Sequence, residues 1–245
     1  MRIPRIYTSA ELLSNQIVSI EAQAHKHIKE VLRLGLGDSV ILFNGNGSDY
    51  LGEITELHKK FLSVYINQQT QVNNESPLNI HLLQPLCRSE KMDWCIQKAT
   101  ELGVRKISTF VSSRVNINIP ANRLDKKLDH WNSVAQSACE QSGRAIVPTI
   151  ESPLEFNTII NNLSNDGLKV IASPVADNNE VENIDVSPEE CVCAIGPEGG
   201  FTEQEIKNAK DAGFYSCLLG PRILRLETAV VSVIVLLQSK WGDLN

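Results

Sequence analysis

The sequence predicts an α/β protein in which a small β-rich domain precedes a larger domain with a mainly parallel sheet. In residues 1–73, short alternating apolar stretches are separated by turns rich in Gly and Asn. Such a pattern is typical of a small barrel or sandwich. After residue 74, apolar strands alternate with segments whose apolar residues recur at helical spacing. That alternation favours a parallel sheet with helices on its faces.

The composition is that of an ordinary globular protein, because 42% of the 245 residues are hydrophobic and 21% are charged. The N-terminus has no uninterrupted apolar run of the kind found in signal peptides, and no apolar stretch reaches the ~20 residues of a membrane span. We therefore expect a soluble, cytoplasmic protein. The net charge is −6, and residues 1–73 contain seven basic and seven acidic residues, so the acidic excess lies in residues 74–245. Any binding of nucleic acid must use local basic patches.

The elements of the N-terminal domain follow from this patterning. Strands are predicted at residues 16–20, 38–43, 50–54 and 61–66, the second ending at the turn signal of residues 44–47. One helix is predicted at residues 22–31. The polar run at residues 68–77 is typical of a linker. We therefore place one domain at residues 1–73 and a second at residues 74–245.

The elements of the C-terminal domain alternate in type. Strands are predicted at residues 78–83, 104–111, 168–172, 191–195 and 214–219. Helices are predicted at residues 89–102, 123–141 and 230–237, and a further helix begins after Thr202. The six cysteines are scattered through apolar sequence without C-x-x-C or Cys/His spacing, so we interpret them as packing residues and predict no metal site.

The turn after the strand at residues 191–195 is the segment that most strongly indicates a ligand-binding site. Three glycines lie between residues 196 and 200, and Thr202 and Glu205 have the spacing of a helix capping box. The glycines allow backbone groups to approach a ligand closely. The turn matches no phosphate-binding motif, and Glu198 would repel a phosphate. A backbone-bound uncharged or zwitterionic ligand fits better, with a purely structural tight turn as the alternative.

A second strand–loop–helix unit follows directly. Its loop, residues 220–229, contains Arg222, Arg225 and Glu227. Two such units in tandem place both loops at the same edge of a parallel sheet, where they can converge on one pocket. The alternative is that Arg225 and Glu227 merely pair with each other and that Thr228 caps the helix.

Taken together, residues 196–201 (GPEGGF) and 219–229 (LGPRILRLETA) resemble the signature of the RsmE family. These SPOUT-superfamily enzymes methylate N3 of a uridine in bacterial 16S ribosomal RNA. Residues 25–33, 98–104 and 140–144 are similar to further motifs of the family. One departure is Ser113, where the family often has an acidic residue before the arginine that corresponds to Arg114.

The resemblance implies a PUA-like β-barrel over residues 1–73 that helps to bind RNA. It implies that residues 74–245 form a SPOUT α/β domain with a deep trefoil knot. This domain would bind S-adenosylmethionine, and the protein would act as a homodimer on 16S rRNA in the small ribosomal subunit. The family motifs place the cofactor at Gly196, Glu198, Gly199, Gly200, Leu219, Gly220, Ile223, Leu224, Leu226 and Thr228.

For the reaction, the first candidate is Arg225, which would stabilise charge on the uracil carbonyls or hold a phosphate, with Glu227 orienting it. Glu198 and Glu140 are candidate general bases, although a carboxylate suits this role only if its pKa is raised. The target base must be unpaired or flipped, because N3 lies on its pairing edge. RNA contacts are expected from arginines at loop edges and motif ends, namely Arg2, Arg5, Arg33, Arg88, Arg114 and Arg144.

Two other functions stay open on the sequence alone. A SPOUT methyltransferase acting on another RNA, such as transfer RNA, would carry the same two loops. A non-catalytic RNA-binding protein would not need the intact glycines of both loops. A small-molecule enzyme of the doubly wound type is a more distant alternative, because no dinucleotide fingerprint is present.

Overall fold

The computed structural model of the chain describes residues 3–114, 117, 119–173 and 179–244. Two compact units make up the chain. The first comprises the residues up to Glu75 together with Gln136–Val147, and the second comprises Ser76–Ala135 and the residues from Pro148 onward. Residues 136–147, which the sequence patterning placed with the second domain, thus belong to the first unit.

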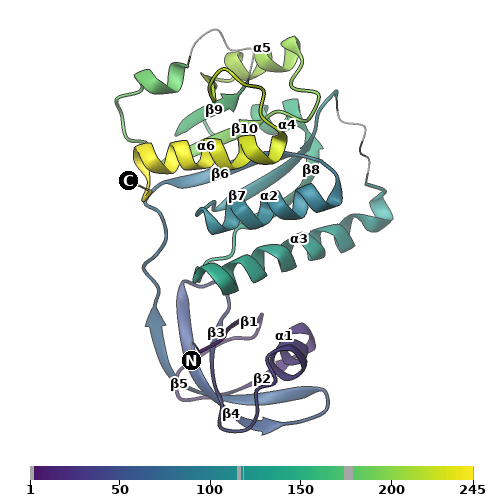
Figure 1. Cartoon of the computed structure of the whole chain (residues 1–245), viewed down its shortest axis with the longest axis vertical. Coiled ribbons are helices and arrows are strands. Elements are labelled where there is room, and N and C mark those ends of the chain that lie inside the picture. Colours follow the sequence, from purple (N-terminus) through teal and green to yellow (C-terminus); the bar gives the residue numbers. More distant parts are fainter. Residues whose placement is uncertain (1–2, 115–116, 118, 174–178, 245) are drawn as a thin grey trace. The chain divides into compact units, whose positions relative to one another are not determined.

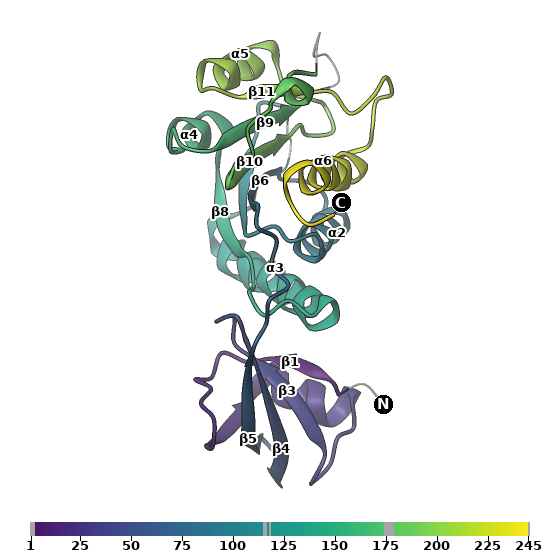
Figure 2. The ribbon, with the colours of Figure 1, turned by 90° about the vertical axis from the view of Figure 1, so that its left-hand side faces the viewer.

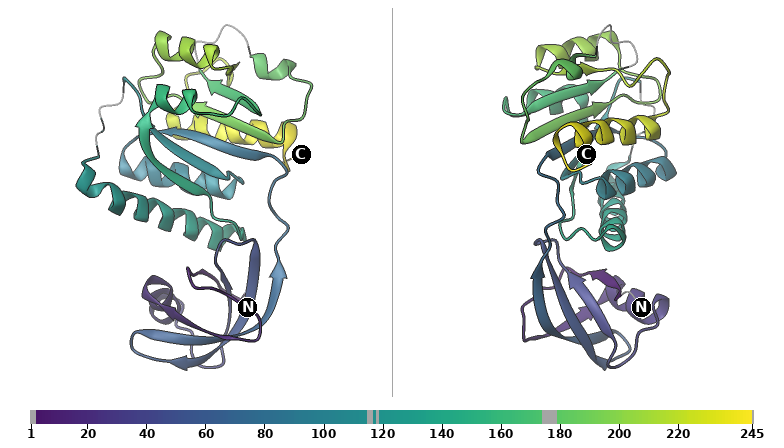
Figure 3. Two further views of the ribbon diagram at one scale, coloured as in Figure 1. Left: turned by 180° about the vertical axis from the view of Figure 1, so that it is seen from behind. Right: turned by 60° about the vertical axis from the view of Figure 1, so that its left-hand side comes forward.

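The first unit is built on a five-stranded sheet of order β1-β3-β4-β5-β2, in which only β1 and β3 are parallel (Figure 3). Its strands are β1 (Arg5–Tyr7), β2 (Ile17–Glu21), β3 (Ser39–Phe43), β4 (Ser48–Leu57) and β5 (Phe61–Gln71). The alternating residues of these strands bury one core that includes Ile20, Leu42, Tyr50 and Leu62. This burial of one face is what the period-two patterning predicts.

Three details of this unit differ from the sequence predictions. The predicted helix at residues 22–31 is a short α1 (Ala22–Lys26) that continues as a wider π-helical turn, η1 (His27–Val31). Strand β5 runs to Gln71, so the first residues of the predicted linker are strand. Strand β1 was not predicted, because three residues are too few to show a period.

The segment Gln136–Val147 is held in the first unit by partly buried polar contacts. Arg5 donates to the carbonyl oxygen of Cys139 at 2.7 Å, and Arg144 pairs with Glu75 at 2.7 Å. The N–H of Tyr7 donates to Glu140 at 2.9 Å. Since each contact joins residues far apart in sequence, patterning alone does not show it.

The second unit contains a six-stranded sheet of order β11-β9-β10-β6-β7-β8, and every adjacent pair is parallel. Its strands are β6 (Asn79–Pro85), β7 (Lys106–Val111), β8 (Thr149–Glu155), β9 (Leu168–Ala172), β10 (Glu190–Ile195) and β11 (Tyr215–Cys217). The prediction of a parallel sheet is confirmed. Strand β8 was missed, because its exposed residues and Pro153 interrupt the apolar pattern.

Helices cover both faces of this sheet. Helices α2 (Ser89–Glu101) and α6 (Leu226–Trp241) lie side by side on one face (Figure 1), and α4 (Phe156–Asn161) and α5 (Glu203–Asp211) cover the other (Figure 2). The long α3 (Ala121–Ser142) begins in this unit, and a 3₁₀ turn, η2 (Glu180–Asn183), lies between β9 and β10. Because all six strands are parallel, the loops that follow them emerge at one edge of the sheet.

Two properties of the described residues bear on the chemistry. All six cysteines are free thiols and five of them are buried. Among the helices in the described part of the chain, none is long and apolar enough to cross a membrane.

Candidate functional site

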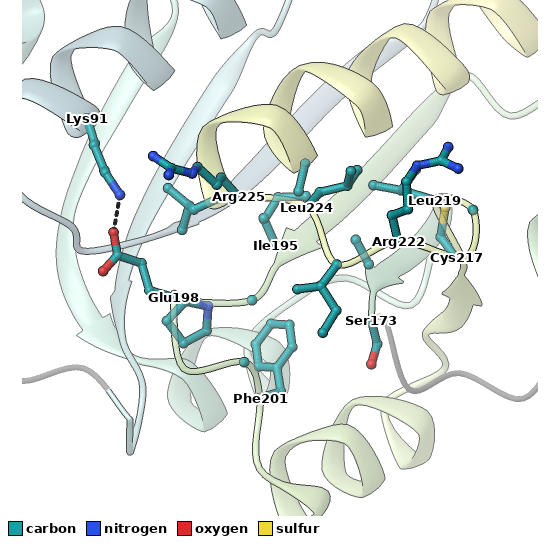
Figure 4. Close-up of a pocket in the computed structure, with 18 residues that line it drawn as sticks. Lys91, Ser173, Ile195, Glu198, Phe201, Cys217, Leu219, Arg222, Leu224 and Arg225 are labelled. Carbon is teal, nitrogen blue, oxygen red and sulfur yellow. Dashed lines mark hydrogen bonds and ion pairs between the residues drawn. The ribbon is translucent and has the colours of Figure 1, made fainter.

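A cavity of about 390 Å³ opens at the carboxyl edge of the parallel sheet (Figure 4). The loops after β10 and β11 form most of its wall, as the tandem strand–loop–helix pattern predicts. The sequence-predicted residues that line it are Gly196, Glu198, Gly200, Leu219, Gly220, Ile223, Leu224, Arg225 and Leu226. The two loops therefore share one cavity.

The loop after β10 is fixed by an aromatic anchor and by a helix cap. Phe201 is 7% exposed and packs against Phe110 and Phe156, with ring centroids 6.1 and 4.9 Å away. A Cβ at Gly196 would lie 3.2 Å from the Phe201 ring, so a glycine here avoids a tight contact with this ring. At the loop's end the predicted capping box is present, because Thr202 and Glu205 each accept the other's backbone N–H.

The loop after β11 turns at Gly220, whose φ of +80° is unfavourable for other residues. Helix α6 begins at Leu226, so Thr228 lies exposed in the first turn and Arg225, not Thr228, occupies the N-cap position. Ile223 lines the cavity and is 87% exposed, which places its side chain at the rim.

A third loop, after β7, supports the first from outside the cavity. Arg114 Nη1 donates to the carbonyl oxygen of Gly199 at 2.9 Å, and the N–H of Ser113 donates to Glu205 at 3.1 Å. A Cβ at Gly199 would lie 3.2 Å from the Arg114 Cβ. Gly199 does not line the cavity, so its absent side chain makes room for Arg114.

Lys91, Glu198 and Arg225 lie at one end of the cavity, where Lys91 extends from α2 toward Glu198, and Arg222 lies at the opposite end (Figure 4). Lys91 forms a hydrogen-bonded ion pair with Glu198 and lies 3.7 Å from Glu227 Oε2. The hydrogen bond raises the pKa of Lys91 and lowers the pKa of Glu198. This pairing disfavours the predicted role of Glu198 as a general base, since a base needs a raised pKa.

The other candidate base, Glu140, belongs to the first unit. Burial raises its pKa, and there it accepts the N–H of Tyr7 and faces His27 at 3.8 Å. These contacts hold segment 136–147 in its unit, so they give Glu140 a role in the fold.

The sequence-predicted RNA arginines that the structure describes fall into two groups. Arg5 pairs with Asp49, and Arg144, which is 3% exposed, pairs with Glu75. Their guanidinium groups are occupied within the fold. Arg33, Arg88 and Arg114 are exposed, whereas Arg2 lies outside the described residues.

Sequence reasoning missed several residues of the cavity. Lys91 and Ser173 come from elements after β6 and β9, and Cys217 ends β11. Their position follows from strand order, which places β10 between β6 and β9 and is not visible in the sequence. Within the part of the chain that the structure describes, no group of three or more His, Cys, Asp and Glu side chains suits a metal ion.

Two family models match the chain. The RNA methyltransferase domain matches residues 74–238, and the RNA methyltransferase PUA domain matches residues 20–66. The chain belongs to this RNA methyltransferase family. It is 37% identical, over 100% of its length and 99% of the relative's, to the ribosomal RNA small subunit methyltransferase E of Buchnera aphidicola subsp. Schizaphis graminum. The resemblance to the RsmE family is thereby confirmed.

Solved structures agree over the whole chain. A methyltransferase from Legionella pneumophila in complex with the bound cofactor SAM superposes with a TM-score of 0.94 at 34% identity, covering 99% of this chain and 100% of that one. The ribosomal RNA small subunit methyltransferase E from Neisseria gonorrhoeae, bound to S-adenosyl methionine, gives 0.91 at 34% identity with full coverage of both. The predicted α/β fold with an N-terminal PUA-like domain is confirmed; the trefoil knot stays a prediction.

The cavity's lining fits S-adenosylmethionine on chemical grounds. Apolar side chains such as Leu219 and Leu224 suit the flat faces of an adenine, and the flanking backbone groups can bond its edge nitrogens.

Proposed function

We propose that this chain uses S-adenosylmethionine to methylate N3 of a uridine in 16S ribosomal RNA, on the assembled small ribosomal subunit. The observation that carries the proposal is the shared cavity of the two glycine loops, in a chain that matches SAM-bound relatives along its whole length. The names of the curated relatives favour ribosomal RNA over transfer RNA as the substrate.

The two loops and Arg225 have different roles in the proposed reaction. The loops after β10 and β11 bind and orient the methyl donor through backbone groups and apolar walls, and they exclude water from it. When bound, S-adenosylmethionine supplies a methyl group already activated by the positive charge on sulfur. Arg225, at the charged end of the cavity, is positioned to stabilise negative charge on the uracil carbonyls as the N3 proton leaves.

RNA contacts are proposed for the exposed arginines near the cavity and in the first unit. Arg114 and Arg88 belong to the loop after β7 and to the start of α2, and Arg33 lies on the PUA-like unit. On an acidic chain such local patches give weak, salt-sensitive binding to naked RNA. A preassembled ribosomal particle, which presents RNA in a fixed shape, suits this charge distribution better. Its assembly site, the cytoplasm, is the proposed location.

A homodimer is also proposed. Helices α2 and α6 each leave a large apolar side chain exposed, Trp94 at 39% and Val235 at 38%. Light scattering on the purified protein tests the dimer, and Trp94→Glu is the variant expected to weaken it if α2 takes part. A monomeric wild-type protein would remove the dimer from the proposal.

The experiment that tests the function compares 16S rRNA from cells with and without the gene. Mass spectrometry of nuclease fragments is expected to show one 3-methyluridine that is lost on deletion and restored by the wild-type gene. Purified protein with labelled S-adenosylmethionine is expected to restore the mark on subunits from the deletion strain. Labelling of transfer RNA instead would establish the rival substrate.

A further inference from the structure

Lys91 lines the cavity, although the sequence analysis did not identify it as a candidate site residue. It comes from the first turn of α2, yet it contacts carboxylates from both cofactor loops, Glu198 after β10 and Glu227 in the first turn of α6. Figure 4 shows its side chain entering the charged end of the cavity. The Lys91 ammonium group of α2 therefore lies between a carboxylate from the loop after β10 and a carboxylate from α6.

The Lys91 ammonium group has more N–H donors than the hydrogen bonds it makes within the described residues. A lysine carries three N–H donors, and within the described residues Lys91 donates one hydrogen bond, to Glu198. The distance of 3.7 Å from Lys91 Nζ to Glu227 Oε2 is too long for a hydrogen bond. That buried oxygen has no hydrogen-bond partner in the described part of the chain. Lys91 can therefore donate to a further acceptor that enters the cavity.

The groups around Lys91 keep it charged. Glu198 and Glu227 favour the ammonium form, whereas Arg225 acts against it, and Arg88 faces Glu198 from the start of α2. One turn along α2, the Cys95 thiol is neutral, because a hydrogen bond with Cys87 and burial raise its pKa. The net result is a raised pKa for Lys91, so its side chain is a cation at neutral pH.

Uracil N3 lies between two carbonyl groups, and loss of its proton spreads negative charge over both carbonyl oxygens. We propose that Lys91 donates a hydrogen bond to one of these oxygens and stabilises the uracil anion that accepts the methyl group. The inference rests on the proposed function. In this step the N3 proton leaves to solvent water and the N3 electron pair forms the N–CH3 bond. The S–CH3 bond breaks with its electrons staying on sulfur, which becomes a neutral thioether.

Lys91→Met tests the proposal, since it keeps most of the side-chain length and removes the charge. An opposite charge nearby shifts a pKa by about 1–3 units, so the variant is expected to methylate about 10- to 1,000-fold more slowly at neutral pH. Its rate should recover toward the wild-type rate as the pH rises, because the uracil anion then forms without help. Lys91→Arg, which keeps the cation, is expected to retain more activity than Lys91→Met.

A second readout changes the acidity of the substrate instead of the pH. Small subunits are reconstituted with 16S rRNA transcribed either with uridine or with 5-fluorouridine, whose N3–H is more acidic. The ratio of the Lys91→Met rate to the wild-type rate is expected to rise toward one on the fluorinated subunits. A ratio that is the same on both substrates and at every pH would overturn the proposal.

Controls separate this role from folding and from cofactor binding. Lys98→Met removes another lysine of α2, one that pairs with Glu101 at 2.9 Å, and is expected to leave the rate and its pH profile unchanged. Calorimetric titration of Lys91→Met should give a S-adenosylmethionine Kd within about twofold of wild type. A much weaker Kd without a shifted pH profile would assign Lys91 to the cofactor and overturn the proposal. A wild-type protein that methylates neither substrate would instead contradict the proposed function.

Discussion

Arg114 donates a hydrogen bond from Nη1 to the carbonyl oxygen of Gly199 at 2.9 Å, which joins the loop after β7 to the loop after β10. The bond lies on the outer side of the loop after β10, because Gly199 does not line the cavity. Arg114 thus supports the loop geometry in addition to its proposed contact with RNA.

Arg114→Ala is expected to weaken S-adenosylmethionine binding without reaching the ligand. Loss of an exposed hydrogen bond of this kind costs roughly 1 kcal/mol, which corresponds to a Kd about fivefold higher. Calorimetric titration in the absence of RNA measures the effect, and Arg33→Ala, in the other unit, serves as the control. An unchanged Kd would leave Arg114 with RNA as its only proposed partner.

Two glycines with the same backbone strain allow the cofactor cavity to be tested against a matched control. Gly220 lines the cavity with φ +80°, and Gly213 has φ +87° with open space around its absent Cβ. Alanine at either position costs about 1 kcal/mol or slightly more for the left-handed backbone. Both variants should therefore lose similar stability in thermal unfolding. Only Gly220→Ala is expected to weaken S-adenosylmethionine binding, and equal affinities would show that its loop does not hold the donor.

The sequence predicted the parts of the site that lie close together along the chain. The glycine loops, the Thr202–Glu205 capping box and the parallel sheet each have a local pattern. Lys91 could not be predicted in this way, because it joins the cavity only through the pairing of β6 with β10. The ion pairs of Arg5 with Asp49 and of Arg144 with Glu75 could not be predicted either, because each pair joins residues that are far apart in the sequence.

Kinetics can distinguish a role of Arg225 in the reaction from a role in binding the cofactor. Arg225→Ala is expected to keep the S-adenosylmethionine Kd and to lose about 100-fold in kcat, since it removes one donor that stabilises charge in the transition state. Single-turnover methylation of small subunits measures the loss. Arg225→Lys keeps a cation at the same place and should lose less. Equal turnover by wild type and Arg225→Ala would remove this residue from the reaction.

Glu205 makes the stability of the second unit depend on pH. Burial alone would raise its pKa, but hydrogen bonds from the Thr202 and Ser113 N–H groups hold it below the usual carboxyl value. A lowered folded-state pKa adds stability above the unfolded-state value, and that stability is lost as the pH falls through the folded-state pKa. Glu205→Gln should therefore unfold at lower temperature than wild type at neutral pH, and the two should converge in acid. Glu203→Gln, exposed in the same helical turn, is the control and should show no such convergence.

Arg144 distinguishes a role in folding from a role in RNA binding. Its side chain is 4% exposed and pairs with Glu75, 10% exposed, at 2.7 Å. Removing one partner of a buried ion pair costs about 3–5 kcal/mol, because the charge that stays buried loses the opposite charge closest to it. Arg144→Met is therefore expected to lower the unfolding temperature of the first unit markedly, and Arg144→Met with Glu75→Leu should recover most of the loss.

The salt dependence of binding to small ribosomal subunits tests whether Arg144 contacts RNA. A phosphate contact contributes about 0.7–0.9 to the slope of log K against log salt concentration, so an arginine that binds RNA lowers the slope when it is removed. The double variant Arg144→Met with Glu75→Leu should bind small subunits with the wild-type slope, whereas Arg88→Met should reduce it. A folded Arg144→Met protein of wild-type stability and reduced slope would reverse the assignment, because the Glu75 pair would then have to open when RNA binds.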